Sequence, residues 1–260
     1  MNRTWDFTDL EFAAAWDATQ ADLVPEPLVY TSSTEFYDDA RAAMREAWAR
    51  VRSRWGHELE EILAAIARPD IRLIVRGLDG QDPRNPKGVV RMLAARKGEV
   101  AYVITQKPGR TFWHAEGFTL TEHEVLSLGD TVAAALPKVP AGKQSDFVLV
   151  EPRAADEFDY SYGRSKIQDF EDAVDSRSEA FNKADATLDG TIVVQQGHSR
   201  FGPRGITNMY MRWRDLVDDG RYVIMPGNPT MVVAADTKRL GALINSHIAE
   251  VVKAIKDDRA

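Results

Sequence analysis

The chain contains the segment Ala101-Tyr102-Val103-Ile104, closed by Pro108-Gly109, and repeats it as Arg221-Tyr222-Val223-Ile224, closed by Pro226-Gly227. Two strand-like segments precede each copy, and one further strand-like segment and a helix-like segment follow it. Tyr-Val-Ile is common in unrelated strands, and Pro-Gly is common in unrelated turns. Five elements nevertheless agree in order, which favours one supersecondary plan built twice.

The two copies of this plan have the following predicted elements. The first has strands over Ile71–Leu78, Val89–Arg96, Glu99–Gln106 and Thr111–Phe118, and a helix over Glu122–Leu136. The second has strands over Thr191–Gln196, Ile206–Arg214, Arg221–Met225 and Thr230–Ala234, and a helix over Thr237–Ile255. Between its first two strands each copy carries a long loop rich in glycine, proline and arginine, Asp79–Gly88 and Gly197–Gly205, where an ordinary hairpin would use a few residues.

The segments outside the repeat predict further helices. Thr8 and Glu11 fit a capping box at the start of a short helix, and Thr121 and Glu124 fit a second one. A long apolar stripe at helical spacing runs from Phe36 to Ile66 before Pro69 ends it, with Gly56 as a candidate kink.

The proline-containing segment 136–142 reads as a linker. We therefore expect two halves, residues 1–140 and 141–260, within one globular unit. In the second half, Phe147–Val150 predicts a short strand. Arg164–Leu188 predicts one or two helices with a thin apolar stripe, which suits either a solvated surface helix or one completed by another protein.

Composition excludes several functional classes. The chain has 260 residues, 44% of them apolar, and a net charge of −7, which opposes nonspecific binding to nucleic acid. No window approaches the roughly 18 consecutive apolar residues of a membrane span, and the acidic N-terminus is unlike a secretory signal. With no cysteine there is no disulfide or thiolate site. These features predict a cytoplasmic protein that neither enters a membrane nor binds nucleic acid.

The sequence shows no signature of catalysis, of a metal site or of a cofactor site. The five histidines lie far apart and lack the paired spacing of a helical metal site. The glycine-rich segment Gly197–Gly205 has neither the ending of a phosphate-binding loop nor the spacing of a dinucleotide fingerprint. Its neighbourhood also lacks the Gly-x-Ser-x-Gly motif of hydrolases. We therefore expect no cofactor, no metal and no enzymatic activity.

One face of the predicted sheet is the best candidate for binding. Alternation in Ile206–Arg214 places Met209, Met211 and Trp213 on one side, and Asn208, Tyr210, Arg212 and Arg214 on the other. Arg72 and Arg76 alternate in the same way with apolar neighbours. Arginine and tyrosine are enriched at protein interfaces. A solvated sheet face carrying long polar side chains is the alternative.

The whole pattern resembles the EspG family of type VII secretion-associated chaperones of actinobacteria. The resemblance spans nearly the full chain and rests on framework segments in family order. They are Trp5–Phe12, Leu63–Asp70, Arg76-Gly77, Val90–Gly98, Leu136–Gly142, Gly220–Gly227 and Val233–Leu240.

This resemblance implies an α+β fold, with a central antiparallel sheet and helices in two quasi-symmetric α/β halves. It also implies a cytoplasmic chaperone that binds a helical PE-PPE heterodimer and shields its apolar tip. The contact residues that it implies lie on the sheet and in the second half. With the arginines of the first-half sheet, the candidates are Arg72, Arg76, Phe201, Arg204, Tyr210, Arg212 and Arg214.

Two other hypotheses stay open at this point. The same sheet surface could pair with itself, which makes the chain a non-enzymatic homodimer. An enzyme whose site has no linear signature is the third hypothesis, and a deep polar pocket holding several titratable groups in contact would support it.

Overall fold

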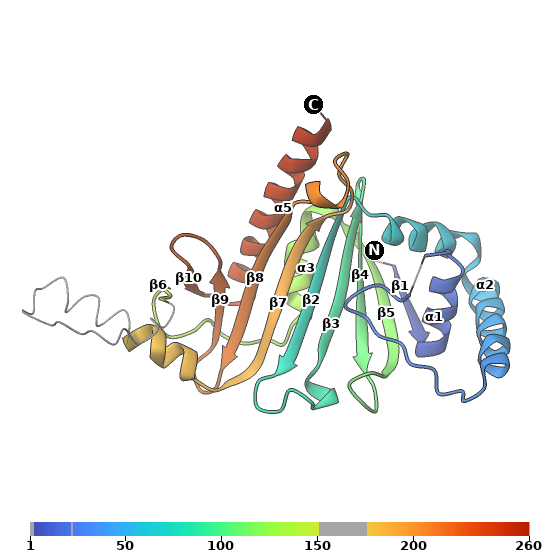
Figure 1. The fold of residues 1–260 in the computed structure, drawn as a ribbon, viewed down its shortest axis with the longest axis horizontal. Helices are drawn as coiled ribbons and strands as arrows, with labels where there is room; N and C mark the ends of the chain where they lie inside the picture. The colour runs from blue at the N-terminus through green and yellow to red at the C-terminus, as the bar shows by residue number, and fades with distance from the viewer. Residues whose placement is uncertain (1–2, 22, 151–175, 260) are drawn as a thin grey trace, which may run out of the picture.

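The strands of this computed structural model, which describes residues 3–21, 23–150 and 176–259, form one antiparallel sheet of ten strands. Their order across the sheet is β1-β5-β4-β3-β2-β7-β8-β9-β10-β6 (Figure 1). The strands are β1 Thr4–Thr8, β2 Ile71–Asp79, β3 Val90–Lys97, β4 Val100–Pro108, β5 Ala115–Glu124, β6 Phe147–Val148, β7 Ala186–Gln196, β8 Asn208–Leu216, β9 Arg221–Met225 and β10 Met231–Ala234. The helices are α1 Asp9–Asp17, α2 Tyr37–Ala67, α3 Leu128–Ala135 and α5 Thr237–Arg259, and short 3-10 turns are η1 Pro86–Gly88, η2 Val125–Ser127 and η3 Pro203–Gly205.

The strand order is the same on both sides of the central pair β2 and β7. These two strands run antiparallel, from Ile71 opposite Gln196 to Asp79 opposite Leu188. Outward from them, β3, β4 and β5 on one side match β8, β9 and β10 on the other. The repeated Tyr-Val-Ile segments therefore lie on equivalent strands, β4 and β9. The predicted α+β class, with one antiparallel sheet in two quasi-symmetric halves, is confirmed, and the boundary between residues 140 and 141 stays a prediction.

Helices α3 and α5 pack together on one face of the sheet, behind the strands in Figure 1. Alternate residues of the central strands, such as Leu73, Val75 and Trp213, form the core beneath them. Gly190 makes room for this packing, because a Cβ at that position would lie 2.3 Å from Cη2 of Trp213. The inward-facing set predicted for β8, with Met211 and Trp213, is confirmed.

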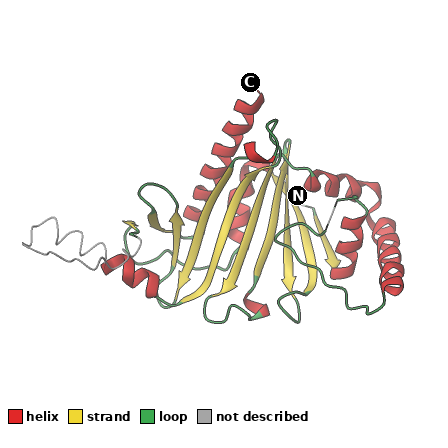
Figure 2. Cartoon of the chain, in the orientation of Figure 1, coloured by secondary structure: helices red, strands yellow, loops and turns green. Residues whose placement is uncertain are grey.

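Among the described residues, helices cover the opposite face only at its two ends. Helices α1 and α2 cover one end, where Phe12, Leu63 and Phe118 belong to one apolar cluster. Helical residues 176–183 cover the other end, where Phe181 packs against Tyr222 and Phe147. Between them, no helix of the described residues lies in front of β2, β7 and β8 (Figure 2). This arrangement leaves the centre of the sheet exposed on one side.

The predicted start of α1 and the kink in α2 are both confirmed. Thr8 and Glu11 form a capping box, in which the Thr8 hydroxyl accepts from the Glu11 N–H at 3.2 Å and the Glu11 carboxylate accepts from the Thr8 N–H at 3.0 Å. Gly56 interrupts α2 with a φ of 66°, a value that favours glycine.

The prediction was wrong around β5. This strand runs from Ala115 to Glu124 instead of from Thr111 to Phe118, and the following helix α3 begins at Leu128 instead of Glu122. The second capping box is therefore also wrong, because Thr121 and Glu124 lie in the strand. The reason is tertiary: β1, which was not predicted, adds to the sheet beside β5 and extends its pairing to Thr121.

The predictions for Arg164–Leu188 and Phe147–Val150 are partly tested. Residues 164–175 lie outside the described residues, and residues 176–183 are helical. Residues 186–188 belong to β7, which begins at Ala186, five residues before the predicted start. The short strand β6 covers Phe147 and Val148 only.

Candidate functional site

The exposed side of β2, β7 and β8 forms a surface that we call the open face. Side chains that point away from α3 and α5 meet there in cross-strand rows set by the register. The rows are Arg72–Gln195–Asn208, Ile74–Val193–Tyr210 and Arg76–Thr191–Arg212, and beside the last one Asp189 lies opposite Arg214. Arginines therefore lie on both sides of an apolar central row, in which Tyr210 is 41% exposed.

Two arginines of the open face make ion pairs near the surface. Arg76 pairs with Glu26, and Nη2 of Arg212 lies 3.3 Å from Oδ1 of Asp189. The side chains of Arg76 and Arg212 are 50% and 47% exposed, so water screens both pairs. Such pairs contribute little to stability. Both guanidinium groups therefore remain accessible to a partner at little cost to the fold.

Two further arginines lack a carboxylate partner among the described residues. Nε of Arg72 is buried without a hydrogen-bond partner. Arg91, which lies opposite Arg76 in the β2–β3 ladder, is buried with its guanidinium 4.4 Å from the Phe112 ring centre. Burial, and secondarily the like charge of Arg76, lower the pKa of Arg91. Among the described residues, the open face therefore carries more arginines than carboxylates that pair with them.

Arg214 has a different role from its neighbours, because its guanidinium is already engaged. It donates to the carbonyl oxygens of Phe181 at 2.6 Å and Ala184 at 2.7 Å, and to Asp189 at 3.1 Å. Its side chain is only 12% exposed. Arg214 thus fixes the end of the 176–183 helix at the border of the open face, and a direct contact with a partner stays a prediction.

A hollow of about 620 Å³ lies where the open face meets this helix. The residues that line it include Leu78 and Pro83, the helix-end residues Asn182 and Ala184, and Arg212. The structure therefore brings the predicted loop Asp79–Gly88 close to the candidates Arg76, Arg212 and Arg214.

This loop is folded around the side chain of Asp79. The carboxylate accepts from the N–H groups of Gln81 at 2.9 Å and Asp82 at 3.1 Å, and from Nδ2 of Asn85 at 2.8 Å. These hydrogen bonds lower the pKa of Asp79, with the bond from Asp82 as the largest cause. At its start, the Gly80 N–H donates to the Thr187 carbonyl at 3.2 Å, which ties the loop to β7.

Phe201 and Arg204 lie at the other end of the sheet. Their loop joins β7 to β8, whereas the hollow lies where β7 begins and β8 ends. From Thr207 to Arg214 the chain advances roughly 23 Å. Phe201 is 66% exposed and Arg204 is also exposed. The structure therefore separates these two candidates from Arg212 and Arg214.

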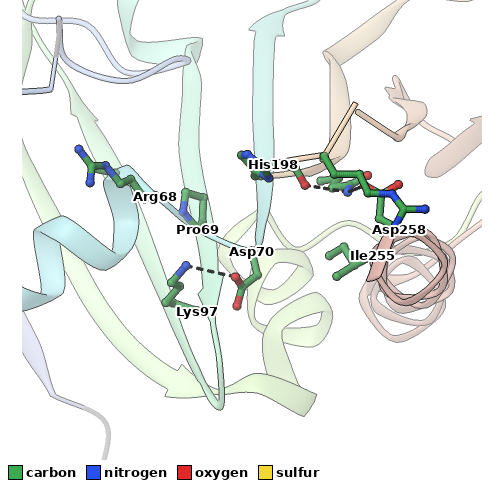
Figure 3. Close-up of a pocket in the computed structure, with 11 residues that line it drawn as sticks. Arg68, Pro69, Asp70, Lys97, His198, Ile255 and Asp258 are labelled. Atoms are coloured by element: carbon green, nitrogen blue, oxygen red, sulfur yellow. Dashed lines mark hydrogen bonds and ion pairs between the residues drawn. The ribbon is translucent and has the colours of Figure 1, made fainter. Parts of the chain in front are cut away.

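A cavity of about 470 Å³ lies beside this loop and the end of α5 (Figure 3). Lys97 and Asp70 form an ion pair at 3.2 Å on its wall, and Arg68 points away from that pair. Asp258 accepts from Nε2 of Gln196 at 2.8 Å, which ties α5 to the end of β7. Lys97, Asp70 and Asp258 have partners within the fold, so they act as ties between elements.

Sequence reasoning did not find Val193, Asp189, Arg91 and Glu26. Val193 already lies in the predicted strand, and an earlier predicted start of that strand would have added Asp189, which alternates with it on β7. Arg91 is itself buried, and burial does not alternate along β3 because residues 91–95 are all buried. Glu26 had no local signal, because only the tertiary fold brings its segment next to Arg76.

Two searches of the described ranges bear on other classes of function. Within residues 3–21, 23–150 and 176–259, no group of three or more histidine, cysteine or acidic residues could hold a metal ion. In the same part of the chain, no helix has the length and apolar character to cross a membrane.

Comparison with known proteins identifies the family. A search of curated proteins found no match. Among solved structures, the chain is similar to EspG5, the type VII secretion system chaperone of Mycobacterium tuberculosis, solved in complex with the PE25–PPE41 dimer. The TM-score is 0.55 at 10% sequence identity, over 95% of this chain and 96% of that chain, so the likeness is one of fold. The family match spans residues 8–246, and the chain belongs to the EspG family.

Proposed function

We propose that this chain is a cytoplasmic chaperone of type VII secretion. It binds a helical, PE-PPE-like heterodimer through the open face, shields an apolar tip of that partner and keeps it soluble for export. The observation that carries the proposal is the uncovered centre of the sheet, with an apolar row between arginines, in a chain of the EspG family. The similar EspG5 structure contains a PE25–PPE41 dimer, which supports a partner of this class.

The physical basis of such a role is burial of apolar surface. A helical secretion substrate with an exposed apolar tip would associate with itself, because burial is favourable by roughly 25 cal/mol per Å². A stable protein interface covers about 800 Å² on each partner. The open face, together with the hollow and the loop beside it, offers a continuous surface for such a contact.

A chaperone role without catalysis fits the site better than an enzyme. The open face presents guanidinium groups, amides, a hydroxyl, a phenol and aliphatic side chains, and its carboxylate Asp189 is paired with Arg212 and Arg214 instead of with a second acid or base. The cavity at the far end of the sheet has an ion pair and hydrogen-bonded carboxylates within its walls. Both features support binding and positioning as the role of these residues.

Co-expression with PE-PPE-like heterodimers encoded beside the gene tests the proposal. We expect a soluble complex of one copy of this chain with one heterodimer, measured by size-exclusion chromatography with light scattering. Tyr210→Ser should weaken the complex, whereas the control Lys253→Ser, on the exposed side of α5, should not. A tight homodimer that buries Tyr210, with no heterodimer bound, would support the self-pairing hypothesis instead.

A further inference from the structure

We infer that the partner presents an acidic surface to the open face, with carboxylates on both sides of an apolar contact. This inference rests on the proposed function and specifies the chemistry of its partner. The occupant is a helical protein whose tip places apolar side chains over Ile74, Val193 and Tyr210. Its carboxylates then meet the arginine rows beside them.

The charges of the open face carry the inference. Five arginines lie on this surface or directly beside it, and among residues 3–21, 23–150 and 176–259 the only carboxylates paired with them are Glu26 and Asp189. The arginines are Arg72, Arg76, Arg91, Arg212 and Arg214. The whole chain, in contrast, has a net charge of −7. A positive surface on an acidic protein favours approach by a negatively charged partner.

The unpaired arginines strengthen the argument. Within the described residues, Arg72 has a buried Nε without a hydrogen-bond partner, and Arg91 lies opposite Arg76 in the ladder with no carboxylate paired to it. A guanidinium group binds a carboxylate through two parallel hydrogen bonds. A partner carboxylate at Arg72 would supply an acceptor there, and another could lie beside Arg76 and Arg91. It would also reduce the repulsion between the two like charges.

The same charges disfavour two other occupants. A second copy of this chain would bring one arginine-rich surface against another, which is repulsive when the open faces meet. A nucleic acid needs a track of cations along its phosphates. Here the apolar row Ile74–Val193–Tyr210 separates the arginine rows, and the acidic remainder of the chain repels phosphates.

The test uses the complete chain and the co-expressed heterodimer, with affinity measured at low and high salt. We expect Arg72→Gln/Arg212→Gln to weaken binding about tenfold or more at low salt and to reduce the salt dependence. Arg72→Lys/Arg212→Lys keeps the charges but loses the paired hydrogen bonds, so it should keep the salt dependence and bind more weakly than the wild type but more tightly than the Arg→Gln variant. Lys253→Gln, on the far side of the sheet, is the matched control and should bind as the wild type does. Thermal unfolding of each variant checks that the fold is intact.

Each outcome decides one point. Wild-type binding that is independent of salt and of the Arg→Gln changes would overturn the acidic partner and leave the proposed function standing. Absence of any complex with the wild type would overturn both. Displacement of the heterodimer by single-stranded RNA at equal concentration would favour nucleic acid and overturn the inference. Lysine substitutions at acidic residues of the partner's tip should weaken its binding to the wild-type chain about tenfold or more.

Discussion

The buried pair of Arg221 and Asp215 gives a quantitative test of how the second half is held together. Nε and Nη2 of Arg221 donate to the two carboxylate oxygens of Asp215 at 2.6 and 2.7 Å, and Nη2 also donates to the Pro137 carbonyl at 2.9 Å. The two side chains are 0% and 1% exposed. Asp215→Ala would leave a buried guanidinium without its counter-charge, next to the segment that joins α3 to β6.

The expected loss follows from this burial. Breaking a buried ion pair by removing one partner costs about 3–5 kcal/mol, because the other charge remains desolvated. That is a large part of a total free energy of unfolding on the order of 5–15 kcal/mol. In a chain of this size, each kcal/mol lowers the melting temperature by roughly 2–4 °C. We therefore expect the variant to melt about 6–20 °C lower.

Urea denaturation of the purified chain measures this loss. Glu179→Ala, which removes the partner of Lys183 from an exposed pair, is the control and should change the free energy of unfolding little. Replacement of both charges, Asp215→Leu with Arg221→Met, should be less destabilising than Asp215→Ala, since no unpaired charge then remains. A loss below about 1 kcal/mol in Asp215→Ala would refute the reasoning.

Three further predictions concern the border of the open face, the core and pH. Arg214→Ala should raise amide hydrogen exchange in residues 176–184 at least tenfold, roughly the effect of losing two charge-assisted hydrogen bonds, while exchange in α5 stays unchanged. Gly190→Ala should cost about 1–3 kcal/mol in urea denaturation, because the new Cβ collides with Trp213, whereas an exposed substitution such as Lys253→Ala should not. Burial lowers the pKa of His247 below 6.5, so its stabilising contribution is complete above that pH and is lost as the pH falls through the folded-state pKa. Denaturation at pH 7 and pH 5 should show a smaller loss in His247→Leu than in the wild type, and equal losses would contradict this assignment.

The sequence predicted the elements that depend on local pattern. Alternation placed Met211 and Trp213 inward and Tyr210 and Arg212 outward on β8, because a strand inverts its side chains at each residue. The capping box at Thr8 and the glycine kink at Gly56 are likewise local features.

The errors lie where distant segments decide the structure. β5 runs to Glu124 because β4 pairs with it as far as that residue and the unpredicted strand β1 pairs on its other side as far as Thr121, and no property of residues 115–124 alone requires these neighbours. In the candidate site, too, local pattern predicted some residues and contacts between distant segments decided others. Tyr210 and Arg212 followed from alternation, whereas the pairing of Arg76 with Glu26 and the hold of Arg214 on the 176–183 helix depend on contacts between distant segments.

The two halves share a sheet but their described residues cover it differently, and that difference creates the open face. On the first half, α1 and α2 bury the face of β4 and β5. On the second, helical residues 176–183 reach only the apolar cluster around Tyr222. The two copies of the repeated segment also differ, because the first has Ala101 where the second has Arg221. In the second copy a buried ion pair of Arg221 secures the linker. Tyr102 and Tyr222 belong to the shared framework, so under the proposed function the features that distinguish one partner from another are expected between and beside the halves, on the open face.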